Sequence, residues 1–179
     1  MMIPVWKRIL ERNPDCVLYL KCEKKRDRFY YESLPKNQYK FLLNKQDRTT
    51  YLDVWNMIDV CIDTYSYSGT TTTCSSLSMG VPVFTIKGDR HVSNVSTSLM
   101  LHTNQDLSSY VASNFDEYVG KIQGRIEAIR KEKSNMAEYT KSQNEYREKV
   151  RHEFFIMMSP KDFMRRFEKV LIDIHEETK

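Results

Sequence analysis

The sequence lacks any apolar run long enough to cross a membrane, and its N-terminus has no hydrophobic core of the kind found in signal peptides. Cysteine is also scarce, and the four cysteines, Cys16, Cys22, Cys61 and Cys74, show no CxxC spacing. This pattern predicts small buried side chains in a reducing compartment instead of a zinc site or a set of disulfides. We therefore expect a cytoplasmic protein that does not bind a membrane.

A large excess of charge is missing as well. The 28 Lys and Arg residues give a net charge of only +4 against 24 Asp and Glu residues, which suits an anionic ligand but does not indicate nucleic-acid binding. The carboxylates are scattered and no His/Cys cluster occurs, so we expect no metal ion. Hydrophobic residues at 40% and a length of 179 residues predict one globular domain, 1–179, with a sizeable core.

Apolar strand patterns alternate with helix patterns along most of the chain. Strands are predicted at 17–22, 39–43, 60–62 and 81–84, with a short edge segment at 107–111. Helices are predicted at 4–12, 47–57, 70–79, 90–101, 114–151 and 160–177, and Asn114 with Glu117 is a plausible capping pair for the helix 114–151. Such alternation implies parallel strands joined by right-handed crossovers, so the predicted fold class is α/β with a doubly wound parallel sheet. Its core covers about residues 15–112, and a helical C-terminal elaboration covers about 114–177.

The segment 59–85, DVCIDTYSYSGTTTTCSSLSMGVPVFT, is the most informative part of the sequence. It predicts a buried strand, a tight turn at Gly69, a helix that starts within Thr70–Thr73 and ends at Gly80, and a second buried strand. A helix start at the carboxyl end of a parallel strand presents free N–H groups and a positive dipole end, which favour phosphate. The alternative is a threonine-rich loop that merely caps a helix.

The run GTTTTCSSLSMGVP, with CIDT before it and VFTIKG after it, resembles the C-terminal catalytic region of the O-GlcNAc transferase family. It is most similar to the Spindly-type branch, the protein O-fucosyltransferases, and the likeness continues through His91, Asn94, Val95, Ser98 and Leu99. The resemblance implies a Rossmann-like C-terminal lobe of a GT-B glycosyltransferase that holds a nucleotide-sugar. The implied donor is a UDP- or GDP-sugar, the acceptor is a Ser or Thr hydroxyl of a protein, and neither a metal nor another cofactor takes part.

By this resemblance Thr70, Thr71 and Thr72 match positions that surround the nucleotide diphosphate, with Gly69 and Thr73 on either side of them. A structural capping role is compatible with that binding role.

Ser75 departs from the family pattern. Both branches place a carboxylate there, where it accepts hydrogen bonds from the ribose hydroxyls. Serine keeps one donor and acceptor but loses the charge and the reach. Because a charge-assisted bond is worth about 1.5–3 kcal/mol, the substitution weakens the expected nucleotide affinity by about tenfold or more.

Four further residues complete the predicted nucleotide-sugar site. Arg48 and Tyr51 stand where the family places a basic residue and a histidine near the base and phosphates; the alternative is an exposed Arg and a half-buried Tyr. Lys21 in YLKC matches a lysine in a similar Spindly-type context, and the alternative is a solvated lysine. His91 matches a Spindly-type histidine, although a lone histidine is more often structural. Asp63 is expected to close the turn after its strand.

The family's lobe begins with a strand and loop that supply a glutamine and a lysine, and we expect residues 1–179 to lack both. The N-terminal lobe and the tetratricopeptide repeats that recruit acceptor proteins are likewise not represented, and no general base can be assigned. We therefore expect this chain to need a missing lobe or a partner chain and to be inactive in isolation. The alternative is a non-catalytic binding module, or a remnant of the fold, that acts through a partner.

Overall fold

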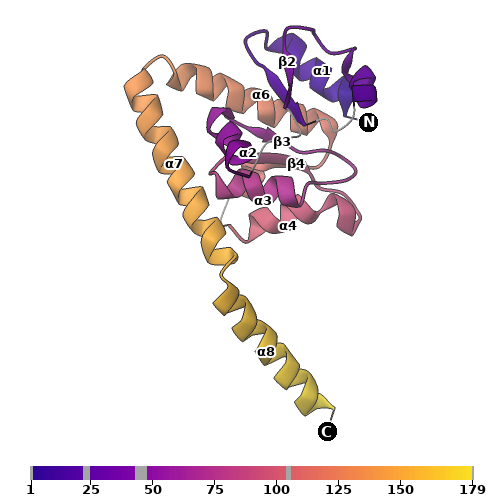
Figure 1. Cartoon of the computed structure of the whole chain (residues 1–179), viewed down its shortest axis with the longest axis vertical. Coiled ribbons are helices and arrows are strands. Elements are labelled where there is room, and N and C mark those ends of the chain that lie inside the picture. The colour runs from indigo at the N-terminus through magenta and orange to yellow at the C-terminus, as the bar shows by residue number, and fades with distance from the viewer. Residues whose placement is uncertain (1, 22–24, 43–47, 104–105, 179) are drawn as a thin grey trace.

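A computed structural model of the chain consists of short parallel strands and the helices that connect them (Figure 1). It describes residues 2–21, 25–42, 48–103 and 106–178. The strands are β1 Leu18–Lys21, β2 Tyr39–Leu42, β3 Cys61–Ile62, β4 Val83–Ile86 and β5 Val111–Ala112. The principal helices are α1 Ile3–Arg12, α2 Arg48–Val54, α3 Thr71–Ser78, α4 Val95–Leu101, α5 Leu107–Tyr110, α6 Phe115–Glu132, α7 Met136–Met157 and α8 Pro160–Glu177. Short 3-10 helices occur at η1 Lys25–Tyr31, η2 Trp55–Met57 and η3 His91–Ser93.

The strand pairs among the described residues are all parallel, which confirms the predicted α/β fold class. The sheet differs from the expectation in one respect: within the described residues it is divided into two parts. One part pairs β1 with β2, with Leu18 opposite Tyr39, and the other part has the order β3-β4-β5. A single continuous doubly wound sheet is therefore not formed by these residues alone.

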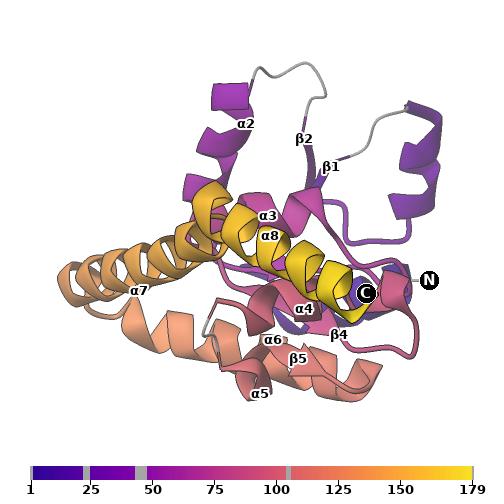
Figure 2. The same ribbon diagram turned by 90° about the horizontal axis from the view of Figure 1, so that it is seen from below.

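Helices cover both faces of the β3-β4-β5 sheet (Figures 1 and 2). On one face, α1 and α6 bury Trp6, Ile9 and Ile122 against Phe84 of β4. On the other face, α3, α4 and α7 form a second apolar cluster. This second cluster is built from Leu77, Val83, Met100, Val150 and Phe154. Because helices cover both faces of this sheet, each residue of β4 is buried, including the polar Thr85.

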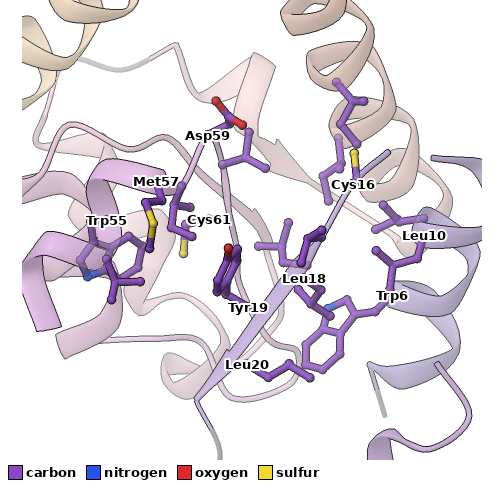
Figure 3. Close-up of a pocket in the computed structure, with 18 of the residues that line it drawn as sticks. Trp6, Leu10, Cys16, Leu18, Tyr19, Leu20, Trp55, Met57, Asp59 and Cys61 are labelled. Carbon is purple, nitrogen blue, oxygen red and sulfur yellow. The ribbon is translucent and has the colours of Figure 1, made fainter. Parts of the chain in front are cut away.

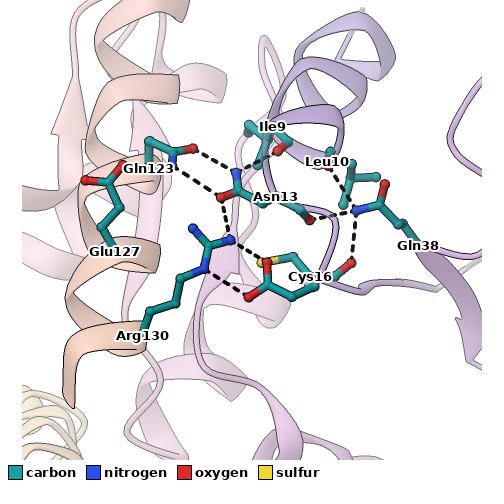
Figure 4. Close-up of polar contacts among 9 residues, drawn as sticks. Ile9, Leu10, Asn13, Cys16, Gln38, Gln123, Glu127 and Arg130 are labelled. Carbon is teal, nitrogen blue, oxygen red and sulfur yellow. Dashed lines mark hydrogen bonds and ion pairs between the residues drawn. The ribbon is translucent and has the colours of Figure 1, made fainter. Parts of the chain in front are cut away.

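A polar network at the C-terminal end of α1 connects the β1–β2 part to α6 (Figure 4). Asn13, which is fully buried, donates from Nδ2 to the Ile9 carbonyl and to Gln123 Oε1, both at 2.7 Å. Its Oδ1 accepts from Arg130 at 2.9 Å. Gln38, just before β2, donates to the Asn13 carbonyl at 2.7 Å. The buried residue Asn13 therefore joins α1 to α6 and to Gln38, the residue before β2.

Several helix boundaries differ from the sequence prediction. The expected continuous helix 114–151 is two helices, α6 and α7, and Asn135 caps the second by accepting from the Glu138 N–H. The expected helix 90–101 is divided into η3 and α4. The expected edge segment 107–111 is a helical turn, α5, and only its last residue enters β5. Asn114 caps α6 as predicted, because its Oδ1 accepts from the Glu117 N–H at 2.9 Å.

The last helix, α8, extends away from the body of the protein and buries none of its residues (Figure 1). It begins as predicted, with the Ser159 side chain accepting from the Asp162 N–H and Pro160 in the first turn. Its apolar side, which includes Phe163, Phe167 and Leu171, is exposed. The helix therefore owes its form to capping and to its own backbone hydrogen bonds in this structure.

Candidate functional site

Asp63 fixes the loop that leads from β3 to α3. Its Oδ1 accepts from the backbone N–H groups of Thr64 and Gly69, both at 2.8 Å, and its Oδ2 accepts from Thr85 Oγ1 at 2.7 Å. The side chain is buried. The Tyr118 hydroxyl donates to the Asp63 carbonyl at 2.8 Å, and burial holds the pKa of Tyr118 well above its usual value. Asp63 therefore closes the turn, as predicted from the sequence.

The first turn of α3 is held against α4 by small polar side chains. Thr73 is buried, and its hydroxyl donates to the Gly69 carbonyl at 3.0 Å and lies 2.8 Å from Ser96 Oγ. Ser68 contributes a hydroxyl that accepts from the Val95 N–H at 3.1 Å. A Cβ at Gly69 would lie 2.9 Å from Thr73 Oγ1, so glycine is required for this close approach. These contacts hold the start of α3 against α4.

Thr70, Thr71 and Thr72 are exposed at this helix start. Thr70 occupies the N-cap position, within the predicted range for the helix start, although its side chain makes no capping hydrogen bond. The N–H groups of the first helical turn have no carbonyl partner within the helix, a general property of helix N-termini. Hydroxyls and N–H groups are therefore presented together to solvent at the positive end of the α3 dipole.

A cavity of about 620 Å³ opens beside this helix start and is lined by Lys21, Tyr51, Thr64 and Thr72 at the carboxyl ends of β1 and β3. The ammonium of Lys21 lies 4.9 Å from the centre of the Tyr51 ring. That ring in turn meets Trp55 edge to face, with centroids 6.3 Å apart. The structure thus brings three of the predicted residues, one cation, one aromatic ring and one hydroxyl, to one end of one cavity.

Of the other predicted site residues whose side chains the structure describes, none lines this cavity. Ser75 lies one turn into α3, and its hydroxyl donates to the Thr71 carbonyl at 2.9 Å. His91 is exposed in η3, next to Val92, whose carbonyl accepts from the Ser68 N–H at 2.9 Å. Arg48 starts α2, but its side chain lies outside the described part of the structure. Thr73 has its hydroxyl turned into the protein, so only its backbone N–H remains for a ligand.

Two further residues that line the cavity were not predicted from the sequence. Thr64 follows directly after Asp63, and its position at the carboxyl end of β3 was a usable signal. Tyr19 lines the cavity from β1, two residues before Lys21, and no sequence signal distinguished it from a core residue. Among the described lining residues at this end, Lys21 carries the only charge, so the local field favours an anion.

No group of His, Cys, Asp or Glu side chains in the described residues could hold a metal ion. Cys16, Cys61 and Cys74 are free thiols, whereas Cys22 lies outside the described residues. Desolvation raises the pKa of Cys61 to about 12, so this thiol stays protonated and is not a nucleophile. In the described part of the chain, no helix is both long and apolar enough to span a membrane.

Comparison with known proteins confirms the resemblance to O-GlcNAc transferases. The chain is 37% identical over 130 residues to the probable UDP-N-acetylglucosamine–peptide N-acetylglucosaminyltransferase SPINDLY of Arabidopsis thaliana, an alignment covering 66% of this chain and 14% of that protein. SPINDLY of Solanum lycopersicum is 37% identical over 131 residues, covering 66% of this chain and 13% of its own. The chain thus spans only about a seventh of the length of these relatives. No protein-family model matches it.

Among solved structures, a mutant O-GlcNAc transferase of Thermobaculum terrenum superposes with a TM-score of 0.73 at 23% identity. The superposition covers 95% of this chain and 32% of that one. At this identity the match establishes the fold, which is that of an α/β lobe of the GT-B kind.

Proposed function

Because the chain is related to SPINDLY-type O-GlcNAc transferases, we propose that it is the nucleotide-sugar-binding lobe of a glycosyltransferase. The proposed reaction transfers GlcNAc or fucose from a UDP- or GDP-sugar to Ser or Thr hydroxyls of an acceptor protein. The observation that carries this proposal is the convergence of Lys21, Tyr51 and Thr72 beside the exposed start of α3.

Each of these groups has a distinct task in the proposed complex. The N–H groups and hydroxyls at Thr71 and Thr72 receive the diphosphate oxygens, because helix N-termini bind phosphate. Lys21 supplies a positive charge to the same diphosphate, and Tyr51 offers a ring face for the base. As the glycosidic bond to the diphosphate breaks, negative charge grows on the leaving phosphate. Fixed donors and a cation then stabilise that charge in the role that a metal ion fills elsewhere.

Thermal unfolding in the presence of UDP and GDP tests the binding step. We expect millimolar nucleotide to raise the melting temperature of the chain, and Lys21→Ala and Thr72→Ala to reduce that rise. Lys40→Ala is the matched control, because Lys40 lies on the neighbouring strand with its ammonium 6.0 Å from the Tyr19 ring and outside the cavity lining. Binding that survives EDTA is also expected. An absence of any shift with either nucleotide contradicts the proposal.

Ser75 offers a second, gain-of-function test. If a ribose lies where the family resemblance implies, Ser75→Glu adds a charged acceptor for its hydroxyls. Hydrogen bonds to charged groups are worth about 1.5–3 kcal/mol, so nucleotide affinity should rise roughly 10–100-fold. Isothermal titration with UDP, GDP and inorganic pyrophosphate distinguishes the causes, because pyrophosphate carries no ribose and its affinity should not rise.

The serine at position 75 also favours a second candidate function, a non-catalytic binding module that acts through a partner. Transfer chemistry requires donor and acceptor to be held together in a cleft from which water is excluded. We expect no transfer from UDP-GlcNAc or GDP-fucose to protein by residues 1–179 alone, and restored transfer when an N-terminal lobe is supplied. Nucleotide binding without transfer in the two-lobe form would favour the binding module.

A further inference from the structure

Helix α7 lies beside the two elements that carry the proposed nucleotide site, α3 and the segment formed by α2 and η2 (Figures 1 and 2). We propose that Arg147, in the middle of α7, is a positioning residue of that site. Its guanidinium holds η2 in place, so that α2 presents the Tyr51 ring to the base of the nucleotide. This inference rests on the proposed function and adds to it a residue that lies outside the cavity lining.

The Arg147 side chain joins α7 to two backbone carbonyls beyond the end of α2. Its Nη1 donates to the Trp55 carbonyl at 3.2 Å, and its Nη2 donates to the Ile58 carbonyl at 2.6 Å. These carbonyls belong to the first residue of η2 and to the residue that caps its C-terminal end. The guanidinium holds its donors in a planar fork, whereas lysine ends in a single ammonium. One arginine therefore fixes both ends of η2.

The same segment is held at a second place by the side chain of Asp59. Its Oδ1 accepts from the Tyr139 hydroxyl of α7 at 2.7 Å, and its Oδ2 lies 3.4 Å from the Lys133 ammonium. Arg147 is half-buried, and the resulting desolvation lowers its pKa, while the nearby Asp59 carboxylate raises it. Arginine nevertheless stays charged in proteins. The segment 55–59 thus has its position set from α7.

The backbone of Arg147 packs closely against the end of α3. A Cβ at Gly80 would lie 2.5 Å from the Arg147 carbonyl oxygen and 2.6 Å from its Cα. Glycine is therefore required for this approach of α7 to the turn after α3. Leu77 of α3 also packs in one cluster with Val150 of α7. A substitution of the Arg147 side chain leaves these contacts of α7 with α3 in place.

Trp55 connects η2 to the predicted site residues in the cavity. Its indole is buried and lines the cavity together with Met57 and Asp59 (Figure 3). The indole meets the Tyr51 ring, one helical turn earlier, edge to face with centroids 6.3 Å apart. The Lys21 ammonium lies 4.9 Å from the centre of the same Tyr51 ring. Because packed side chains move together, displacement of η2 should displace the Tyr51 ring.

The arrangement assigns Arg147 to the base and not to the diphosphate. In the proposed complex the diphosphate is bound by the start of α3 and by Lys21, and the base by Tyr51. The guanidinium bonds to η2, whereas α3 contacts the backbone of Arg147. Loss of the guanidinium should therefore weaken the binding of UDP and GDP. Inorganic pyrophosphate, which has no base, should bind as before.

The test compares Arg147→Met with Arg151→Met in the whole chain. Arg151 is the matched control, because it lies one turn further along α7 and pairs with Glu148 of the same helix at 3.2 Å. NMR titration gives the affinities for UDP, GDP and inorganic pyrophosphate. We expect Arg147→Met to weaken UDP and GDP binding about 3–30-fold, as residues coupled to a site without touching the ligand do. Pyrophosphate affinity should not change, and Arg151→Met should alter none of the three.

Two further measurements test the route through Tyr51. When Arg147→Met is added to Tyr51→Ala, UDP affinity should fall little further, because the ring that Arg147 positions is already absent. The chain contains two tryptophans, Trp6 and Trp55, so its indole N–H signals are assigned by Trp6→Phe. Without nucleotide, Arg147→Met should shift the Trp55 signal and leave that of Trp6 in place.

The outcomes separate this inference from the proposed function. Unchanged UDP affinity or an unchanged Trp55 signal in Arg147→Met would overturn the role of Arg147. Equal losses for UDP and pyrophosphate would also overturn it, because they indicate general damage to the site. If the methionine variant does not fold, Arg147→Lys replaces it with the same expectations, since one shorter ammonium does not reproduce the fork. A parent chain that binds neither UDP nor GDP would overturn the proposed function, and this inference with it.

Discussion

Removing the Asp63 carboxylate should destabilise the loop on which the proposed site is built. Asp63→Ala deletes the acceptor of three hydrogen bonds, from the Thr64 and Gly69 N–H groups and the Thr85 hydroxyl. Each bond to a charged group is worth about 1.5–3 kcal/mol, but bonds within one network do not add. Single substitutions above about 4–5 kcal/mol are exceptional. We therefore expect a loss of about 3 kcal/mol in the free energy of unfolding.

For a chain of this size, 1 kcal/mol shifts the melting temperature by about 2–4 °C, so Asp63→Ala should lower it by about 6–12 °C. Asp63→Asn is the matched variant. Its amide oxygen still accepts from Thr64 and Gly69, and its NH₂ group faces Thr85 Oγ1, which turns to accept. That variant should lose about 1 kcal/mol. Urea unfolding monitored by circular dichroism, with equal m-values checked, measures both changes.

The same two variants distinguish a displaced β3–α3 loop from a general loss of the fold. Asp63→Asn should retain the binding of UDP or GDP. Asp63→Ala should lose this binding even at temperatures where the protein is still folded, because Gly69 and the start of α3 are no longer held. The reasoning is refuted if the alanine variant unfolds within about 0.5 kcal/mol of the parent chain, the range of an ordinary surface substitution. It is also refuted if the asparagine variant loses as much stability as the alanine variant.

Three further changes test other parts of the structure. Asn13→Ala should cost about 2–3 kcal/mol in urea unfolding, because it removes the buried amide that joins α1 to Gln123 and Arg130 of α6, whereas Asn13→Asp should restore none of the donor bonds. Gly80→Ala should destabilise by several kcal/mol in the same assay, because Gly80 has a φ of +69° and a Cβ there would lie 2.5 Å from the Arg147 carbonyl oxygen. Deleting 160–179 should leave the free energy of unfolding of the remaining chain unchanged within about 0.5 kcal/mol, because α8 buries no residue.

The sequence predicted the features that depend on local chemistry. The order strand, turn, helix and strand over 59–85 is present as β3, α3 and β4. Asp63 closes its turn, and Asn114 caps α6 through a bond of 2.9 Å to the Glu117 N–H. Each of these depends on residues close together in the chain, where the choice of side chain nearly determines the geometry.

Features that depend on distant residues could not be predicted. Thr73 has the same side chain as Thr72, yet it is buried, because Ser96 of α4 meets that face of α3. The division of the sheet into two parts could not be predicted from the sequence either, since each strand pattern is consistent with a continuous sheet. Likewise, the meeting of Lys21 with Tyr51 joins residues from β1 and α2 across the cavity. The packing of helices on the sheet decides these contacts, and periodicity alone does not specify it.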